Sequence, residues 1–415
     1  MKKIIISAAV AAMALSTSAL AADKGIDITT TGQGVVYYQT SDTGDNSMFG
    51  QDNSSANVGL QLNLDADLKN GFTFGAQLSY LGTAGLEKNL VSDTRQVSAG
   101  SSLWAGLDGD TTNELALTQI NVAKTVGNTT VKLGRQELPK SLSPFAYSEG
   151  WNVFKNTFDA ILAINTDIPD TTLVGAYVSG GTGMSLDSTS NLVAGQTGLD
   201  VNGAAYMLTA QNKSIPMTTL TGSYYDVSKV GGANSNNANA MWLDAAIAGA
   251  DMPLGLSVGI QGGQIAVDLA TMPAAEDTTA FGVKVGLAPV EALNIGLAFT
   301  SVDDGTVAIK NFGTGIKSPL YTQMVANQDA ISLDGDTMMA SAAYSFGAAG
   351  TVTARGTLTS AGAGNINGEN DFRDLELLYT LNAGGVSYLA AFVNTELDDG
   401  SDAVNIVRLW ARLNF

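Results

Sequence analysis

Carboxylates, lysines and arginines are the side chains of this sequence that could do chemistry, because its 415 residues contain neither histidine nor cysteine. Without cysteine there are no disulfides, thiolate nucleophiles or thiolate-bound metals, and without histidine the commonest general base near neutral pH is missing. A hydrolase would need an unusual mechanism in which aspartate or lysine activates a serine. We therefore expect a protein that is not an enzyme and that uses no cofactor.

Charged residues stand at the polar positions of segments in which polar and apolar side chains alternate. From residue 57 to 68, apolar residues occupy every second position, and Asp65 and Asp67 fall between them. The same period of two, typical of a half-buried β-strand, recurs further along the chain. It covers residues 72–80, 254–261, 281–287 and 293–300. Strands of this kind give a sheet one apolar face and one polar face.

The N-terminus has the order of a secretory signal peptide. Two lysines precede an apolar run over residues 4–15, and a stretch of small residues then ends in Ala19-Leu20-Ala21. About twelve apolar residues are too few for a helix that crosses a bilayer, which needs about 20. We expect residues 1–21 to be a cleaved signal peptide and residues 22–415 to be exported.

Strand length and turn spacing favour a transmembrane barrel over a soluble β-sandwich. The alternating segments run for about ten to twelve residues, near the 9–11 of a tilted membrane-crossing strand and above the 5–6 usual in soluble sheets. Short connections alternate with longer, variable ones, as in outer-membrane barrels. The short connections are centred near Asn70, Asn128, Pro169, Ser214, Met252, Pro289, Ala348 and Gly384.

These short turns separate the chain into pairs of strands. They predict an all-β fold, a transmembrane antiparallel β-barrel of about 18 strands, with 16 as the alternative count. A β-propeller also repeats about every 40 residues, but its strands are about half as long, and the sequence carries no blade signature. A soluble exported β-protein is the other alternative, because alternation is common to both classes.

The C-terminal strand carries a signal of its own. In residues 407–415 apolar side chains occupy alternate positions, and the chain ends on Phe415. Such a strand resembles the recognition signal of outer-membrane proteins that the barrel-assembly machinery inserts. The opposite face carries Arg408 and Arg412, which a soluble sheet would have to bury and a water-filled lumen accommodates.

Residues 131–159 resemble one family of outer-membrane barrels. The sequence Val-Lys-Leu-Gly-Arg-Gln at residues 131–136 is followed by a loop with two prolines and then by Asn156-Thr157-Phe158-Asp159. These motifs are similar to porins of the OprD type and to the related major outer-membrane proteins of campylobacteria. The resemblance implies an 18-stranded barrel, a homotrimer, and a third long loop, around residues 137–157, that folds inward to narrow the pore.

Arg135 has an ambiguous position in this motif. Strict alternation places it on the apolar face with Val131 and Leu133, where it would point at lipid. A β-bulge at Gly134 would turn the side chain inward, as bulges do at barrel rims. We predict that bulge, with Arg135 in the lumen.

Charged residues of the polar face and of the inward loop are candidates for lining the pore. Opposed acids and bases across a constriction create a transverse field that orders water and favours small polar solutes. The alternative for each residue is a solvated or paired charge away from the narrowest point. The strand candidates, besides Arg135, are Asp65, Asp67, Asp244, Lys284, Arg355, Asp374, Glu376, Arg408 and Arg412. The loop candidates are Glu137, Lys140, Glu149 and Lys155.

The formal charge of −19 opposes nucleic-acid binding and favours a preference for cations. We expect a diffusion porin for ions and small hydrophilic solutes. The alternative is a barrel that acts as an adhesin or structural anchor through its external loops. Acidic clusters such as Asp398-Asp399 lack the spacing of a calcium-binding loop. We therefore expect no metal site and place these loop tips near lipopolysaccharide.

Overall fold

The computed structural model describes residues 26–44, 47–96, 113–186, 193–194, 199–200, 204–230 and 235–415. The predicted signal peptide, residues 1–21, lies outside the described residues. In the described part of the chain, no helix is long and apolar enough to cross a membrane. Regular structure consists of antiparallel β-strands and a few short 3-10 turns.

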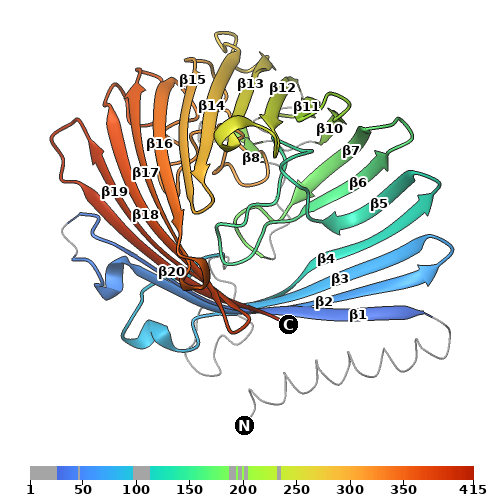
Figure 1. The fold of residues 1–415 in the computed structure, drawn as a ribbon, viewed down its shortest axis with the longest axis horizontal. Helices are drawn as coiled ribbons and strands as arrows, with labels where there is room; N and C mark the ends of the chain where they lie inside the picture. The colour runs from blue at the N-terminus through green and yellow to red at the C-terminus, as the bar shows by residue number, and fades with distance from the viewer. Residues whose placement is uncertain are drawn as a thin grey trace.

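Eighteen strands lie side by side in one closed antiparallel sheet (Figure 1). Neighbours in the chain pair with each other, β7 pairs with β10 across a small separate hairpin of β8 and β9, and β20 pairs with β1 to close the barrel. The predicted 18-stranded barrel is confirmed, and the alternative count of 16 is wrong. The strands are β1 (Asp27–Ser41), β2 (Ser54–Lys69), β3 (Phe72–Gly82), β4 (Asn113–Val126), β5 (Thr129–Gln136), β6 (Phe158–Asn165), β7 (Thr171–Gly181), β8 (Val193–Ala194), β9 (Leu199–Asp200), β10 (Ala205–Asn212), β11 (Thr218–Ser228), β12 (Asn236–Ala248), β13 (Ser257–Leu269), β14 (Thr278–Val290), β15 (Leu293–Val302), β16 (Gly335–Ser345), β17 (Thr351–Ala361), β18 (Phe372–Ala383), β19 (Val386–Leu397) and β20 (Val404–Asn414).

Seven of the eight predicted short turns lie at a connection between two strands that pair with each other; the eighth comes at residues 291–292, because Pro289 still belongs to β14. One of the two-residue turns joins β18 and β19, where Gly384 and Gly385 have φ angles of 59° and 78°. Two consecutive residues with positive φ make a hairpin turn whose twist matches that of antiparallel strands, and glycine adopts this conformation without a steric penalty. Turn chemistry and strand alternation therefore agree along the chain.

The strands present an apolar outer face. Trp242 on β12 is buried inside the barrel, whereas its neighbours Met241 and Leu243 are 55% and 61% exposed. Leu297 on β15 and Leu358 on β17 are each 63% exposed in the same way. A continuous surface of exposed apolar side chains is expected where the surrounding medium is lipid rather than water.

Two long loops enter the barrel and fill much of it. One is the loop at residues 137–157, between β5 and β6, which Figure 1 shows running into the interior. The other is the loop at residues 303–334, between β15 and β16, whose inward path the sequence did not predict. Phe145 of the first loop stacks on Phe312 of the second, with ring centroids 5.3 Å apart. Phe145 also makes edge-to-face contacts with Tyr225 on β11 and Trp242 on β12.

Candidate functional site

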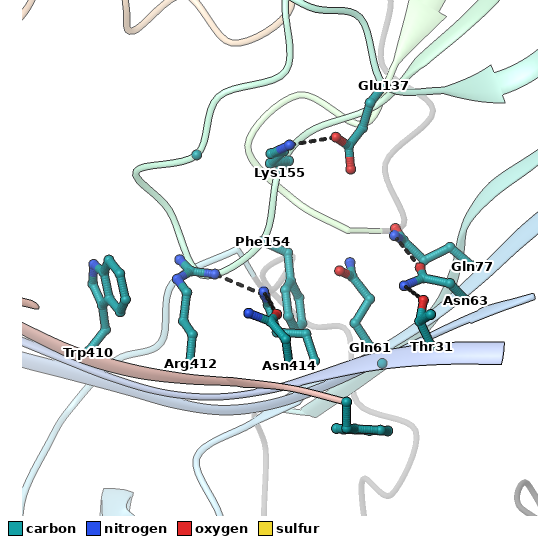
Figure 2. A pocket seen from close by; sticks show the side chains of 14 residues that line it. Thr31, Gln61, Asn63, Gln77, Glu137, Phe154, Lys155, Trp410, Arg412 and Asn414 are labelled. Carbon is teal, nitrogen blue, oxygen red and sulfur yellow. Dashed lines mark hydrogen bonds and ion pairs between the residues drawn. The ribbon is translucent and has the colours of Figure 1, made fainter. Parts of the chain in front are cut away.

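A polar cavity lies between the loop at residues 137–157 and the wall formed by β20 and β1–β5 (Figure 2). It consists of spaces of about 720 Å³ and 310 Å³. Both are lined by Asn63, Gln77 and Glu137, so they are contiguous, and we call them together the polar cavity. The other lining residues are Thr31, Gly32, Gln33, Gln61, Asp65, Gly75, Ala76, Gln119, Asn121, Lys132, Gly150, Phe154, Lys155, Trp410, Arg412, Asn414 and Phe415.

Strand register sets amide side chains of the cavity wall in rows across the sheet. Asn414 on β20 pairs with Gln33 on β1, which pairs with Gln61 on β2. Directly opposite residues of antiparallel strands point to the same face. Gln33 donates a hydrogen bond to Asn414 Oδ1 at 2.9 Å, and Gln61 donates one to Ser79 Oγ on β3 at 2.9 Å. The first row therefore crosses four strands.

A second row runs beside the first. Thr31, Asn63 and Gln77 are opposite one another on β1, β2 and β3, and Gln77 is opposite Gln119 on β4. Gln77 donates to Asn63 Oδ1 at 2.8 Å, and Asn63 donates to Thr31 Oγ1 at 3.1 Å (Figure 2). The wall of the polar cavity is thus a sheet of mutually bonded amides and hydroxyls.

A β-bulge on β4 adds a further polar side chain to this wall. The register of β3 and β4 shifts between Gln77 and Leu78, so that Thr118 is the extra residue. Thr118 is buried behind the cavity lining and donates to Gln77 Oε1 at 2.7 Å, and its neighbour Gln119 lines the smaller space. A bulge lets two consecutive side chains point to one face, which strict alternation forbids.

Four of the predicted pore-lining charges reach the polar cavity. Glu137 and Lys155, at the two ends of the inward loop, form an ion pair of 2.7 Å (Figure 2). Arg412 donates to the carbonyl oxygens of loop residues 152 and 153 and to Gln33 Oε1. Asp65 lines the smaller space together with Lys132, a residue that sequence reasoning did not select.

Five other predicted charges hold the loop at residues 303–334 against the wall. Tyr321 of that loop donates to Asp244 Oδ2 at 2.5 Å and lies under the Lys284 ammonium group, 4.0 Å from its ring centroid. Glu376 accepts hydrogen bonds from the Val325 main-chain N–H and from Arg355. On the same strand, Asp374 accepts one from the Asn327 side chain at 3.2 Å. These groups position a loop and do not line the polar cavity.

Glu149 and Lys140 join the two inward loops. Asn311 and Thr314 of the second loop donate to Glu149 Oε1 at 2.8 Å and 2.5 Å. Lys140 donates to the carbonyl oxygen of Ser318 at 2.8 Å. These contacts make the loops one unit within the barrel.

Burial between the two inward loops lowers the pKa of two lysines. Desolvation lowers the pKa of Lys140 to about 8, although Glu149 partly opposes the shift. Desolvation also lowers the pKa of Lys317 to about 7, again against the attraction of Glu149, while Arg408 and Lys140 lower it further. Lys317 therefore changes its charge near neutral pH.

The predicted bulge at Gly134 is wrong, and Arg135 faces outward. The register of β5 with β4 and β6 runs through Gly134 without a shift. Arg135 is opposite Ile120, which is 46% exposed, and opposite Asp159, with which it forms two hydrogen bonds of 2.8 Å and 2.9 Å. Because opposite residues share a face, the guanidinium lies on the outer wall, where the carboxylate neutralises it.

The two remaining candidates do not line the polar cavity. Asp67 lies near the turn end of β2, half exposed, and pairs with Lys69 at 3.5 Å. Arg408 on β20 donates to Gln39 Oε1 at 2.9 Å and to the carbonyl oxygen of Trp151 in the inward loop. In the described residues, no group of three or more acidic side chains is placed to hold a metal ion.

Sequence reasoning missed the amide rows because it selected charged residues only. Gln61, Asn63 and Gln77 occupy the polar positions of the segments that define β2 and β3, so the alternation itself could have identified them. The inward path of the loop at residues 303–334 had no such signal, since its contacts come from distant strands.

A closed barrel of 18 antiparallel strands with an apolar outer face and a polar cavity inside is a fold of bacterial outer-membrane proteins. Solved structures of the Occ and OprD type share it. Pseudomonas aeruginosa OccK8 (OprE) superposes with a TM-score of 0.74 at 15% sequence identity, over 94% of this chain and 98% of that one. Acinetobacter baumannii OccAB3 gives 0.74 at 12% identity, over 94% and 99%. Pseudomonas aeruginosa OccK1 (OpdK) gives 0.73 at 13%, over 94% and 98%.

The likeness to these proteins lies in the fold rather than in the sequence. No protein-family model matches the sequence, and no curated protein is significantly similar to it. The predicted OprD-type barrel is confirmed at the level of the fold. The motif at residues 131–136 does end β5, and β6 begins at Phe158 after the inward loop.

Proposed function

We propose that the chain is a diffusion channel of a bacterial outer membrane that passes ions and small hydrophilic solutes. The polar cavity carries this proposal. It is the space between the loop at residues 137–157 and the wall of β20 and β1–β5, and most of its lining residues carry amide, hydroxyl or charged groups. A barrel that served only as an anchor would need no polar space of this kind, because its interior could be packed with apolar side chains.

We further propose a weak preference for cations that arises outside the polar cavity. The charges lining the cavity nearly balance: Asp65 and Glu137 are acidic, and Lys132, Lys155 and Arg412 are basic. The negative charge of the chain as a whole therefore acts from its loops. Such a field is screened within about 10 Å at 0.1 M salt, so the preference should weaken as salt is raised.

Conductance measurements in planar lipid bilayers test this function. Purified, folded protein should produce stepwise conductance, and the reversal potential across a salt gradient should have the sign of cation preference at low salt. Folding is checked beforehand by the shift in gel mobility on boiling. Folded protein that produces no channels would contradict the proposal and favour the alternative, an adhesin or anchor that acts through its external loops.

The assembly route, the oligomeric state and the lipid contacts of the chain are proposed as well. We propose assembly by the barrel-assembly machinery, a homotrimer, and acidic loop tips beside lipopolysaccharide. Phe415 supports the first, because its side chain is 60% exposed at the end of the closing strand and its main chain pairs with Gly32 of β1. Deletion of Phe415 should lower the amount of folded barrel in the outer membrane, and the mass of the detergent-extracted protein should be that of three chains.

A further inference from the structure

We propose that the polar cavity selects neutral polyhydroxylated solutes of monosaccharide size over carboxylates and amines of the same size. This inference rests on the proposed function, since it names the class of solute that the channel favours.

The amide rows are the first support. Each amide offers both a donor and an acceptor, and a hydroxyl group does the same. Asn63 and Gln77 lie opposite each other on β2 and β3, at the strand spacing of about 4.8 Å, and Gln61 lies two residues from Asn63 along β2. A solute with several hydroxyls can exchange bonds with successive amides as it moves, because each lost bond is replaced by an equivalent one.

The state of the charged groups is the second support. Lys155 already pairs with Glu137 at 2.7 Å, and the Arg412 guanidinium donates to two loop carbonyl oxygens at 2.7 Å. A carboxylate solute would have to displace these partners and pass the acidic groups of Asp65 and Glu137, which line the smaller space together. An amine, which is positively charged, would be repelled by Lys132, Lys155 and Arg412. Neutral solutes meet neither penalty.

Trp410 is the third support. Its ring lines the larger space on the same strand as Arg412, which lies between the ring and the amides of the first row (Figure 2). The Arg412 guanidinium lies 4.7 Å from the ring centroid. An aromatic ring next to hydrogen-bonding groups suits a sugar ring, which has apolar C–H faces and a hydroxyl rim. Such a surface offers nothing to a small inorganic ion.

Current noise in planar bilayers tests the inference with three probes of similar size: glucose, gluconate and glucosamine. The intact protein is recorded in KCl, and each current is corrected for the conductivity of the bulk solution. We expect glucose to interrupt the current reversibly with an affinity at least threefold above that of either charged probe. Open channels that gluconate or glucosamine block as strongly as glucose would overturn this inference and leave the proposed function intact. Folded protein without channels would overturn both.

A double variant tests whether the amides cause the preference for glucose. The double substitution Asn63→Leu and Gln77→Leu keeps the number of side-chain heavy atoms at residue 63, reduces it by one at residue 77, and removes two amides, each worth a factor of about five in affinity. We expect glucose binding to fall by about tenfold or more while channels persist. The matched control is Asn382→Leu, at an exposed position near the turn between β18 and β19, and it should behave as wild type. If the double variant folds and retains its affinity for glucose, the amides do not select the solute; if it fails to fold, the ranking of the three probes on the wild-type channel still decides.

Discussion

The guanidinium of Arg412 donates a hydrogen bond of 2.7 Å to the main-chain carbonyl oxygen of Val153. A second bond of the same length goes to the carbonyl oxygen of Asn152. Arg412 belongs to the last strand of the barrel, and both carbonyls belong to the loop that enters the barrel after β5. The strand that closes the barrel therefore also fixes the loop that borders the polar cavity.

Substitution of Arg412 should loosen this loop. Hydrogen bonds to a charged group contribute about 1.5–3 kcal/mol each, so Arg412→Gln should raise the population of displaced loop by about tenfold or more. The expected result is frequent flicker in single-channel recordings. Arg373→Gln is the control, since Arg373 lies exposed on β18 and pairs with Glu396. Recordings of Arg412→Gln as quiet as those of the control would show that the tether does not hold the loop.

Phe145 should be the main apolar anchor of the same loop. It is fully buried among Phe312, Tyr225 and Trp242, so Phe145→Ala should weaken loop docking by about 3–5 kcal/mol. Single-channel conductance should rise because the loop no longer fills its side of the barrel. External protease should also cleave the loop faster. Phe49→Ala removes an exposed phenylalanine from another loop and should change neither quantity; equal effects of the two substitutions would refute the anchor role.

The ion pair of Glu137 and Lys155 should set the charge balance of the polar cavity. Glu137→Gln leaves the basic residues unbalanced and should shift the permeability ratio towards anions by about twofold or more. Lys155→Gln should shift it towards cations. Glu396→Gln, in an exposed ion pair, is the control for loss of one carboxylate. Reversal potentials measured at low salt decide, and shifts of the same sign in both cavity variants would contradict this assignment.

Lys317 should make the stability of the barrel depend on pH. Its pKa in the folded chain is about 7, below the ordinary value of 10.5, so the unfolded state binds more protons between these values. The free energy of unfolding should therefore rise as pH increases from about 7 to about 10. The temperature at which the unboiled gel mobility is lost should rise with it. Lys317→Met should reduce this slope.

Some slope should remain in Lys317→Met, because the pKa of Lys140 is also lowered, to about 8, and has the same sign. Lys213→Met alters an exposed lysine in the turn after β10 and should keep the wild-type slope. Two results would show that this lysine is not the titrating group. One is a wild-type transition temperature that decreases as pH is raised from 7 to 10, and the other is a pH slope in Lys317→Met equal to that of wild type.

The sequence by itself determined the strands, the short turns and the two faces of the wall. A period of two in side-chain polarity and the residues of short turns are local properties, and together they predicted a closed barrel of about 18 strands, with 16 as the alternative count. The same alternation placed Arg135 on the outer face, and the prediction of a bulge at Gly134, which departed from it, was wrong. The bulges of this region lie instead at Thr118 on β4 and at Ser179 on β7.

Only the tertiary structure decided which inward residues meet water and which meet a loop. Asp65 and Glu376 both stand on the polar face of a strand, yet Asp65 lines the polar cavity and Glu376 is buried against the Val325 main chain. Alternation fixes the side of the wall to which a residue points. It carries no information about the loops at residues 137–157 and 303–334, whose paths depend on contacts between residues far apart in the chain, such as Arg412 with Val153.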